Sequence, residues 1–361
     1  MQKGRTEPGP APLIRLLLAV YALLIVYASL HPFAGWRDPG ASPFAYLLAP
    51  WPRWTSGLDA FLNVLGYAPY GLLCAVLLRL RLGRPAALGG ALLGAALLSI
   101  VLEAAQSYLP ARVASNVDVL CNLAGAALGA GAGLRFSGWL LAHGPLYRLR
   151  SAAFLPGRGA DFGLVLLGLW LFVQLDPTTL LFGVGDLRDF VVPLDGQLRS
   201  PQFFVAVEAF SAAANLTAVG LLLSALLAPR WPARPTLVFL VALALAIRSA
   251  AEVLLTRSDP LAWLTPGAID GLAAGLVAAL LAVSLPRTVG LGLAAVLIMA
   301  ATVLVNASPP NPYFAATLAL WHQGHFLNFN GVTRLVSVTW PFLALAYLVF
   351  LASGRGRGAQ A

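Results

Sequence analysis

Seven polar residues in the first third of the chain have types and spacings that fit a single site for acid–base or ligand-binding chemistry. They are Asp59, Asn63, Glu103, Gln106, Arg112, Asp118 and Asn122. Asp59 and Asn63 are four residues apart, so we expect them on one face of a helix. The same spacing separates Asp118 from Asn122. Three carboxylates beside one guanidinium shift one another's pKa, and they can bind a cation, a proton or a polar headgroup.

Glu103 is the most informative of the seven, because the surrounding stretch 86–109 is otherwise apolar or small and long enough to span a bilayer. It precedes Pro110 by seven residues, which is roughly 10 Å at 1.5 Å per residue. An ionised side chain within a membrane helix costs about 2.5–3.5 kcal/mol on an insertion scale. Glu103 therefore requires a partner or a wet cavity, and Arg112 in the following loop is a candidate.

Structural explanations of these residues stay open beside the functional one. Asp118 follows Ser115 in an S-x-x-D pattern, so it is equally well explained as a helix cap. Asp59 stands near an expected helix start, where the helix dipole favours an acid. Glu103 stands at the opposite, unfavourable end of its helix. A structural ion pair with Arg112 is therefore the alternative to a functional role for Glu103.

The composition indicates an integral membrane protein. Of the 361 residues, 59% are hydrophobic and only 10% are charged, against about 25% charged residues in soluble domains. The net charge of +9 does not indicate a nucleic-acid partner, because the basic residues fall mainly in short loops between apolar stretches. Cys74 and Cys121 stand in apolar stretches at different expected depths, so we expect no disulfide.

Ten apolar windows reach the length of about 20 residues that a membrane-spanning helix needs. They are 12–32, 58–79, 86–109, 115–141, 161–182, 203–228, 235–256, 266–286, 288–307 and 335–353. Fifteen Lys and Arg residues fall on the side of the termini and seven on the other side, while Arg248 stands inside a window. The positive-inside rule then predicts that both termini are cytoplasmic. The expected fold is an all-α, polytopic transmembrane helix bundle.

The chain also contains a candidate internal repeat. Asp59 and Glu103 are 44 residues apart, and so are Glu208 and Glu252. The offset of 208 − 59 = 149 residues relates two four-span units of the same orientation, roughly 12–141 and 161–286. Chance similarity among apolar residues is the alternative explanation.

The repeat predicts three parts: residues 1–150, a degenerate second four-span unit at 151–286, and two additional spans at 287–361. Ala212 and Leu255 stand where the first copy has Asn63 and Gln106, so we place the site in the first copy. Within the second copy, Arg248 and Glu252 are spaced i, i+4. We interpret them as a structural ion pair.

The remaining motifs carry little chemistry. His322 and His325 form one H-x-x-H pair, for which a surface role is favoured over metal binding. The aromatic residues of 33–57 suit a bilayer interface or a lid over the polar site. The chain has no G-x-S-x-G, P-loop or H-E-x-x-H motif. We therefore expect no metal site and no cofactor, and the motifs leave any catalytic residue unknown.

The spaced polar residues resemble the VanZ-like family of bacterial membrane proteins. The resemblance rests on Asp59-x3-Asn63-x5-Pro69-x-Gly71, on Glu103-x2-Gln106-x3-Pro110-x-Arg112-x2-Ser115-x2-Asp118-x3-Asn122-x2-Gly125, and on the opening Tyr27-Ala28-Ser29-Leu30-His31-Pro32-Phe33. It covers roughly residues 12–141. The resemblance implies a multi-pass protein of the bacterial cytoplasmic membrane, from a family linked to resistance to teicoplanin, a lipid-bearing glycopeptide. It implies no particular reaction.

Three functions remain open at this point. The first is binding of a lipid or glycolipid headgroup in an outward-facing pocket, with membrane lipids and a lipid-linked or glycopeptide ligand as partners. The second is an embedded enzyme that uses Glu103 or Asp118 as general acid or base on a lipid-linked substrate. The third is a proton-coupled transporter. The sequence has no recognisable nucleophile–base pair or metal set, which favours binding.

Overall fold

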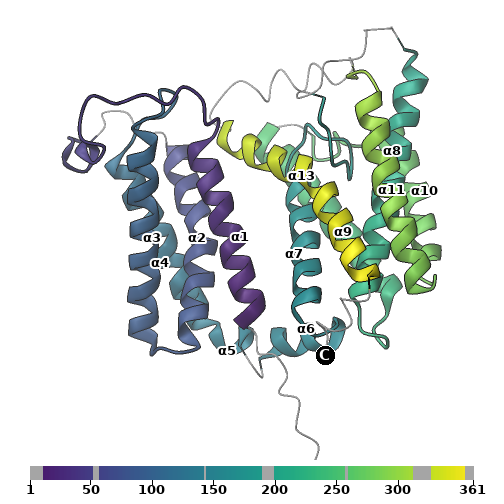
Figure 1. Ribbon diagram of the computed structural model, residues 1–361, viewed down its shortest axis with the longest axis horizontal. Helices are drawn as coiled ribbons and strands as arrows, with labels where there is room; N and C mark the ends of the chain where they lie inside the picture. Colours follow the sequence, from purple (N-terminus) through teal and green to yellow (C-terminus); the bar gives the residue numbers. More distant parts are fainter. Residues whose placement is uncertain are drawn as a thin grey trace, which may run out of the picture. The chain divides into compact units, whose positions relative to one another are not determined.

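The computed structural model describes residues 11–51, 57–141, 144–188, 199–256, 259–311 and 327–353. Within these ranges the regular structure is helical, as the expected fold class requires, and one isolated antiparallel bridge joins Phe154 to Leu227. The chain divides into two compact units, Met1–Ser151 and Ala152–Ala361 (Figure 1). The further division expected at residue 287 stays a prediction.

Eight helices of the described residues are long and apolar enough to cross a membrane. They are α1 (Ala11–Leu30), α2 (Gly57–Arg79), α3 (Arg84–Gln106), α4 (Asn116–Arg135), α8 (Pro201–Leu226), α9 (Ala233–Ala251), α11 (Arg287–Ala307) and α13 (Leu327–Ala352). Shorter elements are η1 (Ala45–Leu48), α5 (Ser137–Leu140), α6 (Pro145–Ala153) and a π-helical turn, η2 (Glu252–Thr256). The protein is a multi-pass membrane protein.

The expected count of ten spans is not confirmed. Windows 161–182 and 266–286 form α7 (Arg158–Val173) and α10 (Pro266–Ala282), which have 16 and 17 residues. At 1.5 Å per residue these lengths are about 24–26 Å, short of a hydrocarbon core of about 30 Å. The apolar window at α7 continues to Phe182, but Pro177 disfavours a helical conformation at Asp176 and the chain turns there.

In the first unit, α1 to α4 lie side by side (Figure 1), and α2 packs most extensively against α4. Glycines allow this close approach, because a Cβ at Gly125 would overlap the Val64 carbonyl and one at Gly129 would overlap the Ala68 carbonyl. At Gly66 of α2, by contrast, a Cβ would meet nothing within 4 Å in the described residues.

In the second unit, α8 packs mainly against α10 and α11, and α7 packs against α13. The face of α10 toward α8 also carries glycines: a Cβ at Gly271 would lie 2.7 Å from the Ala209 carbonyl oxygen. Trp170 and Trp340 are fully buried in this unit. The pairing of α8 with α10 through glycines therefore resembles the pairing of α2 with α4.

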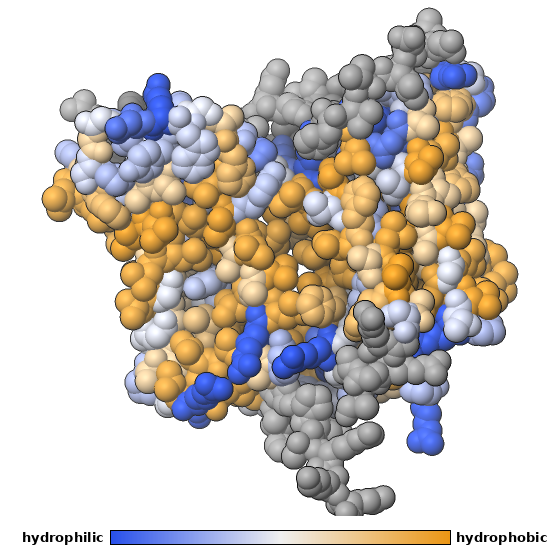
Figure 2. Space-filling model, in the orientation of Figure 1, coloured by the Kyte–Doolittle hydropathy of each residue, from blue (hydrophilic) through white to orange (hydrophobic). Residues whose placement is uncertain are grey.

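The outer surfaces of the helices are apolar along their middle parts. On α3, Leu93, Leu97 and Val101 are exposed and follow one another at four-residue spacing. Figure 2 shows hydrophobic residues, in orange, along the flanks of the helices and hydrophilic residues near their ends. A large exposed apolar surface of this kind is what the interior of a bilayer covers.

Candidate functional site

The seven predicted polar residues all lie toward one end of the first unit. There α1 and α3 end, at Leu30 and Gln106, while α2 and α4 begin, at Gly57 and Asn116. We call this the acidic end, because Asp59, Glu103 and Asp118 stand on these helix termini. The opposite end, where α2 and α4 finish at Arg79 and Arg135 and α3 begins, is the basic end.

Glu103 is buried, with 4% of its surface exposed, and its carboxylate has a backbone partner. Its Oε2 accepts a hydrogen bond of 2.9 Å from the N–H of Ser115, the N-cap residue of α4. The positive end of the α4 dipole favours an acid at this place. Glu103 thereby joins the end of α3 to the beginning of α4.

The predicted ion pair between Glu103 and Arg112 does not form in the described residues. Arg112 instead donates hydrogen bonds to the carbonyl oxygens of His31, at 3.1 Å from Nε, and Ala28, at 3.3 Å from Nη2. The last carbonyls of α1 have no partner within the helix, so they are strong acceptors for a cation. Burial lowers the pKa of Arg112, and the nearby charge of Glu103 opposes that shift.

Gln106 acts beside Arg112. Its Nε2 donates a hydrogen bond of 2.9 Å to the carbonyl oxygen of Ser29. Two of the seven predicted residues therefore bind the end of α1 and do not present their donors to the carboxylates.

Asp118 lies near the other two carboxylates of the acidic end. It interacts with the side chain of Asn63 across the α2–α4 contact and lies within electrostatic range of both Asp59 and Glu103. In the described part of the chain, neither Glu103 nor Asp118 has a Lys or Arg within 4.0 Å. The predicted S-x-x-D cap forms in part: the Ser115 hydroxyl caps α4 by accepting from the N–H of Val117 at 3.2 Å, with Asp118 in the first turn. The Ser115 N–H, which a capping box would bond to Asp118, is donated to Glu103 instead.

Asn122 lies deeper between α3 and α4. Its Nδ2 donates a hydrogen bond of 2.9 Å to Oγ of Ser99, and its Oδ1 is buried without a partner. Tyr67 interacts with the side chain of Ser99 and lies within electrostatic range of Glu103. Sequence reasoning missed Ser99 and Tyr67, because a serine or tyrosine in an apolar window carries no distinctive signal.

The segment after α1 covers part of the acidic end. Tyr46, in η1, is buried and donates a hydrogen bond of 3.0 Å to the carbonyl oxygen of Ile100 on α3. Burial raises the pKa of Tyr46, and the charge of Glu103 raises it further. Trp36 and Trp51 are exposed, which suits the interfacial role expected of this segment. Trp54 lies outside the described residues.

Residues 15–137 match the VanZ/LLP1 family model. These residues are a VanZ-like domain. The match includes α1 to α4 and all seven polar residues of the predicted site. No curated protein and no solved structure matches the chain.

Outside the VanZ-like domain, the second unit contains a buried arginine, Arg248, whose exposed fraction is 2%. We call this arginine and the oxygen atoms that surround it the cation clamp. The predicted pair with Glu252 is confirmed, with 3.5 Å between Nε and Oε1. The guanidinium also donates to the carbonyl oxygens of Pro177 at 3.0 Å and Thr179 at 2.7 Å, and to that of Asp176. Arg248 therefore fixes the turn after α7 to the end of α9.

Further polar residues of the second unit escaped sequence reasoning. Asp176 is buried and accepts hydrogen bonds from the hydroxyls of Thr178, at 2.6 Å, and Thr333, at 3.0 Å. Ser211 and Asn215 are buried on α8 without side-chain partners. The Asp176-Pro177 sequence inside an apolar window was the available signal for the first of these.

The described residues contain no group of three His, Cys, Asp or Glu side chains that could hold a metal ion. His322 and His325 lie outside them.

Proposed function

We propose that the VanZ-like domain binds the polar headgroup of a lipid or glycolipid at its acidic end. The observation that carries this proposal is the cluster of carboxylates at the ends of membrane helices. Among the described residues, Glu103 and Asp118 have no cation in contact, while Arg112 binds the end of α1. Carboxylates in such a place need hydrogen-bond donors, which a ligand can supply.

The chemistry of the cluster selects the ligand class. Ionised carboxylates only accept hydrogen bonds, and the buried Oδ1 of Asn122 is a further acceptor without a partner. A headgroup rich in hydroxyl or ammonium donors therefore complements the site, whereas a bare phosphate would place acceptors against acceptors. Sugar-bearing lipids and amino-bearing headgroups fit this requirement.

The membrane orientation belongs to the same proposal. The charge bias of the loops supports an outward-facing acidic end and cytoplasmic termini. Labelling tests this in a variant in which Cys74 and Cys121 are replaced by alanine. A cysteine at Ser42 should react with an impermeant thiol reagent in intact cells, while one at Arg158 should not. The reverse pattern would contradict the orientation.

We also propose that the second unit is a degenerate copy of the first. The glycine-mediated pairing of α8 with α10 supports this, and so does the hydrogen bond of 2.6 Å from the Thr265 hydroxyl to Glu208. Thr265 is the N-cap residue of α10, as Ser115 is of α4. A role in glycopeptide resistance is a further proposal that rests on the family match.

Lipid analysis tests the binding proposal. The purified wild-type protein and its Glu103→Gln and Asp118→Asn variants are compared by mass spectrometry of the lipids that co-purify with them. We expect one donor-rich lipid class to be depleted in both variants. Asp38→Asn is the matched control, because it removes an acid from an exposed turn where Asp38 bonds only the N–H of Gly40. Identical lipid profiles in all four proteins would refute the proposal.

A further inference from the structure

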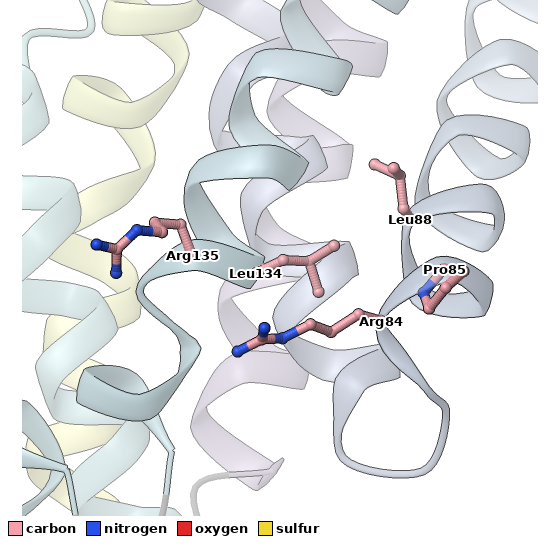
Figure 3. A pocket seen from close by; sticks show the side chains of 5 residues that line it. All are labelled: Arg84, Pro85, Leu88, Leu134 and Arg135. Carbon is pink, nitrogen blue, oxygen red and sulfur yellow. The ribbon is translucent and has the colours of Figure 1, made fainter.

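The VanZ-like domain has a hollow of about 510 Å³ at its basic end, opposite the site described above. It is lined by Arg84, Pro85, Leu88, Leu134 and Arg135. Figure 3 shows that the Arg84 side chain extends from the beginning of α3 toward the end of α4, beneath Leu134. The hollow therefore combines an apolar wall with two cationic side chains.

The apolar wall follows from the packing of α3 against α4. Leu134 is buried in a cluster with the small residues Ala87, Ala91 and Ala130, and Leu88 packs against that cluster. These small residues allow α3 and α4 to pack closely, and the hollow lies beside the leucines where the helices end. A hydrocarbon chain can occupy such a space without leaving buried polar groups unpaired.

Neither arginine has an acidic partner in the described residues. The Arg84 side chain makes no hydrogen bond or ion pair there, and Arg135 lies with its guanidinium carbon 5.6 Å from the centre of the Phe136 ring. Both side chains are exposed. Guanidinium groups bind phosphate oxygens in a bidentate geometry.

No described acid of the domain competes for these arginines. Asp59, Glu103 and Asp118 stand at the acidic end. Asp38 is also tied to that end, because the N–H of the adjacent Arg37 donates a hydrogen bond of 2.9 Å to the carbonyl oxygen of Tyr108. The charge at the basic end is therefore positive, and it complements a negatively charged ligand.

We propose that this hollow binds an anionic phospholipid, with its phosphate between Arg84 and Arg135 and an acyl chain against Leu88 and Leu134. The place favours a membrane lipid as the source of the phosphate, because the hollow lies at the ends of membrane-spanning helices. Phe136 and Trp139 are exposed next to Arg135, where aromatic residues mark the level of the headgroups.

Native mass spectrometry of the full-length protein tests this proposal. Phosphatidylglycerol and zwitterionic phosphatidylcholine are titrated separately into wild type, Arg84→Gln, Arg135→Gln and the double variant. We expect phosphatidylglycerol affinity to fall roughly fivefold for each arginine removed, with little change for phosphatidylcholine. Both substitutions are at exposed side chains, so an unchanged thermal unfolding midpoint verifies the fold.

Arg81→Gln is the matched control, because Arg81 is exposed in the turn before α3 and does not line the hollow. Its phosphatidylglycerol affinity should stay within about twofold of wild type. An equal loss in the control would show diffuse attraction and overturn the proposal. So would full retention in the double variant. Displacement of the lipid by inorganic phosphate alone would assign the hollow to a soluble anion.

Discussion

The two units place an acid at the same sequence spacing and hold it in different ways. In the VanZ-like domain, Glu103 accepts from the backbone N–H of Ser115 at 2.9 Å, and the neighbouring arginine binds elsewhere. In the second unit, Glu252 meets Arg248 one turn away on its own helix segment, at 3.5 Å. The first arrangement leaves the carboxylate without a cation in contact in the described residues, whereas the second pairs it with an arginine.

Gly267 marks a second difference between the two units. The 149-residue offset that relates Asp59 to Glu208 also relates Asp118 to Gly267, since 118 + 149 = 267. A Cβ at Gly267 would lie 2.6 Å from Oε2 of Glu208, so Glu208 occupies the space that a side chain there would need. Where the first unit brings carboxylates together, the second has one carboxylate against a glycine. The two units therefore share glycine-mediated helix packing but differ in the polar groups at the corresponding positions.

The largest expected effect is that of removing the clamp in the second unit. Arg248→Ala would leave Glu252 buried without its cation, and truncating one partner of a buried pair typically costs 3–5 kcal/mol, or about that much here. We expect little folded protein, measured as yield after size-exclusion chromatography. Arg112→Ala is the comparison in the first unit, and it should be milder because Arg112 is only partly buried. Equal losses would remove the distinction between the two arginines.

The next largest difference is expected when Glu103 and Glu252 are each replaced by glutamine, which keeps the shape and removes the charge. Glu103→Gln keeps an acceptor for the Ser115 N–H, so the thermal unfolding midpoint should change little while lipid binding is lost. Glu252→Gln removes the carboxylate in contact with the buried Arg248 and should lower that midpoint clearly. If Glu103→Gln combined with Arg112→Gln recovers full lipid binding, the acidic end is scaffolding. The functional proposal would then be withdrawn.

Two buried asparagines give a smaller and opposite pair of effects. Asn122 donates to Ser99, whereas both polar side-chain atoms of Asn215, which is 1% exposed, have no partner. A buried unsatisfied polar group costs about 1–3 kcal/mol. Asn215→Leu should therefore raise the midpoint of thermal unfolding, and Asn122→Leu should lower it. Destabilisation by Asn215→Leu would show that its amide is used, for example by ordered water.

The elements were predictable from the sequence where local pattern decides them. Apolar windows located the helices, and i, i+4 spacing found Arg248 with Glu252. Contacts between distant segments were not predictable, because the carbonyls of Pro177 and Thr179 that bind Arg248 are 71 and 69 residues away. The binding of Arg112 to the end of α1 was not predictable for the same reason, since its acceptors at His31 and Ala28 are 81 and 84 residues away. Chain spacing suggested Glu103 as its partner, but unpaired helix carbonyls competed better.

The smallest expected effect tests whether burial, and not pairing alone, makes Arg248 important. Asp186 and Arg188 form an ion pair of 2.6 Å in the second unit, but their side chains are 44% and 23% exposed. Burial raises the pKa of Asp186, but the hydrogen bonds and charge of Arg188 lower it by more, so the net pKa is depressed. This pair therefore stabilises the fold above the ordinary aspartate pKa of about 3.9, and its contribution disappears as pH falls through the depressed value.

Arg188→Gln should cost less than about 1 kcal/mol at pH 7, because exposed pairs are screened by water. Thermal unfolding of wild type and variant should converge as Asp186 becomes protonated. A loss at pH 7 as large as that of Arg248→Ala would mean that ion pairing in this unit is decisive even at the surface.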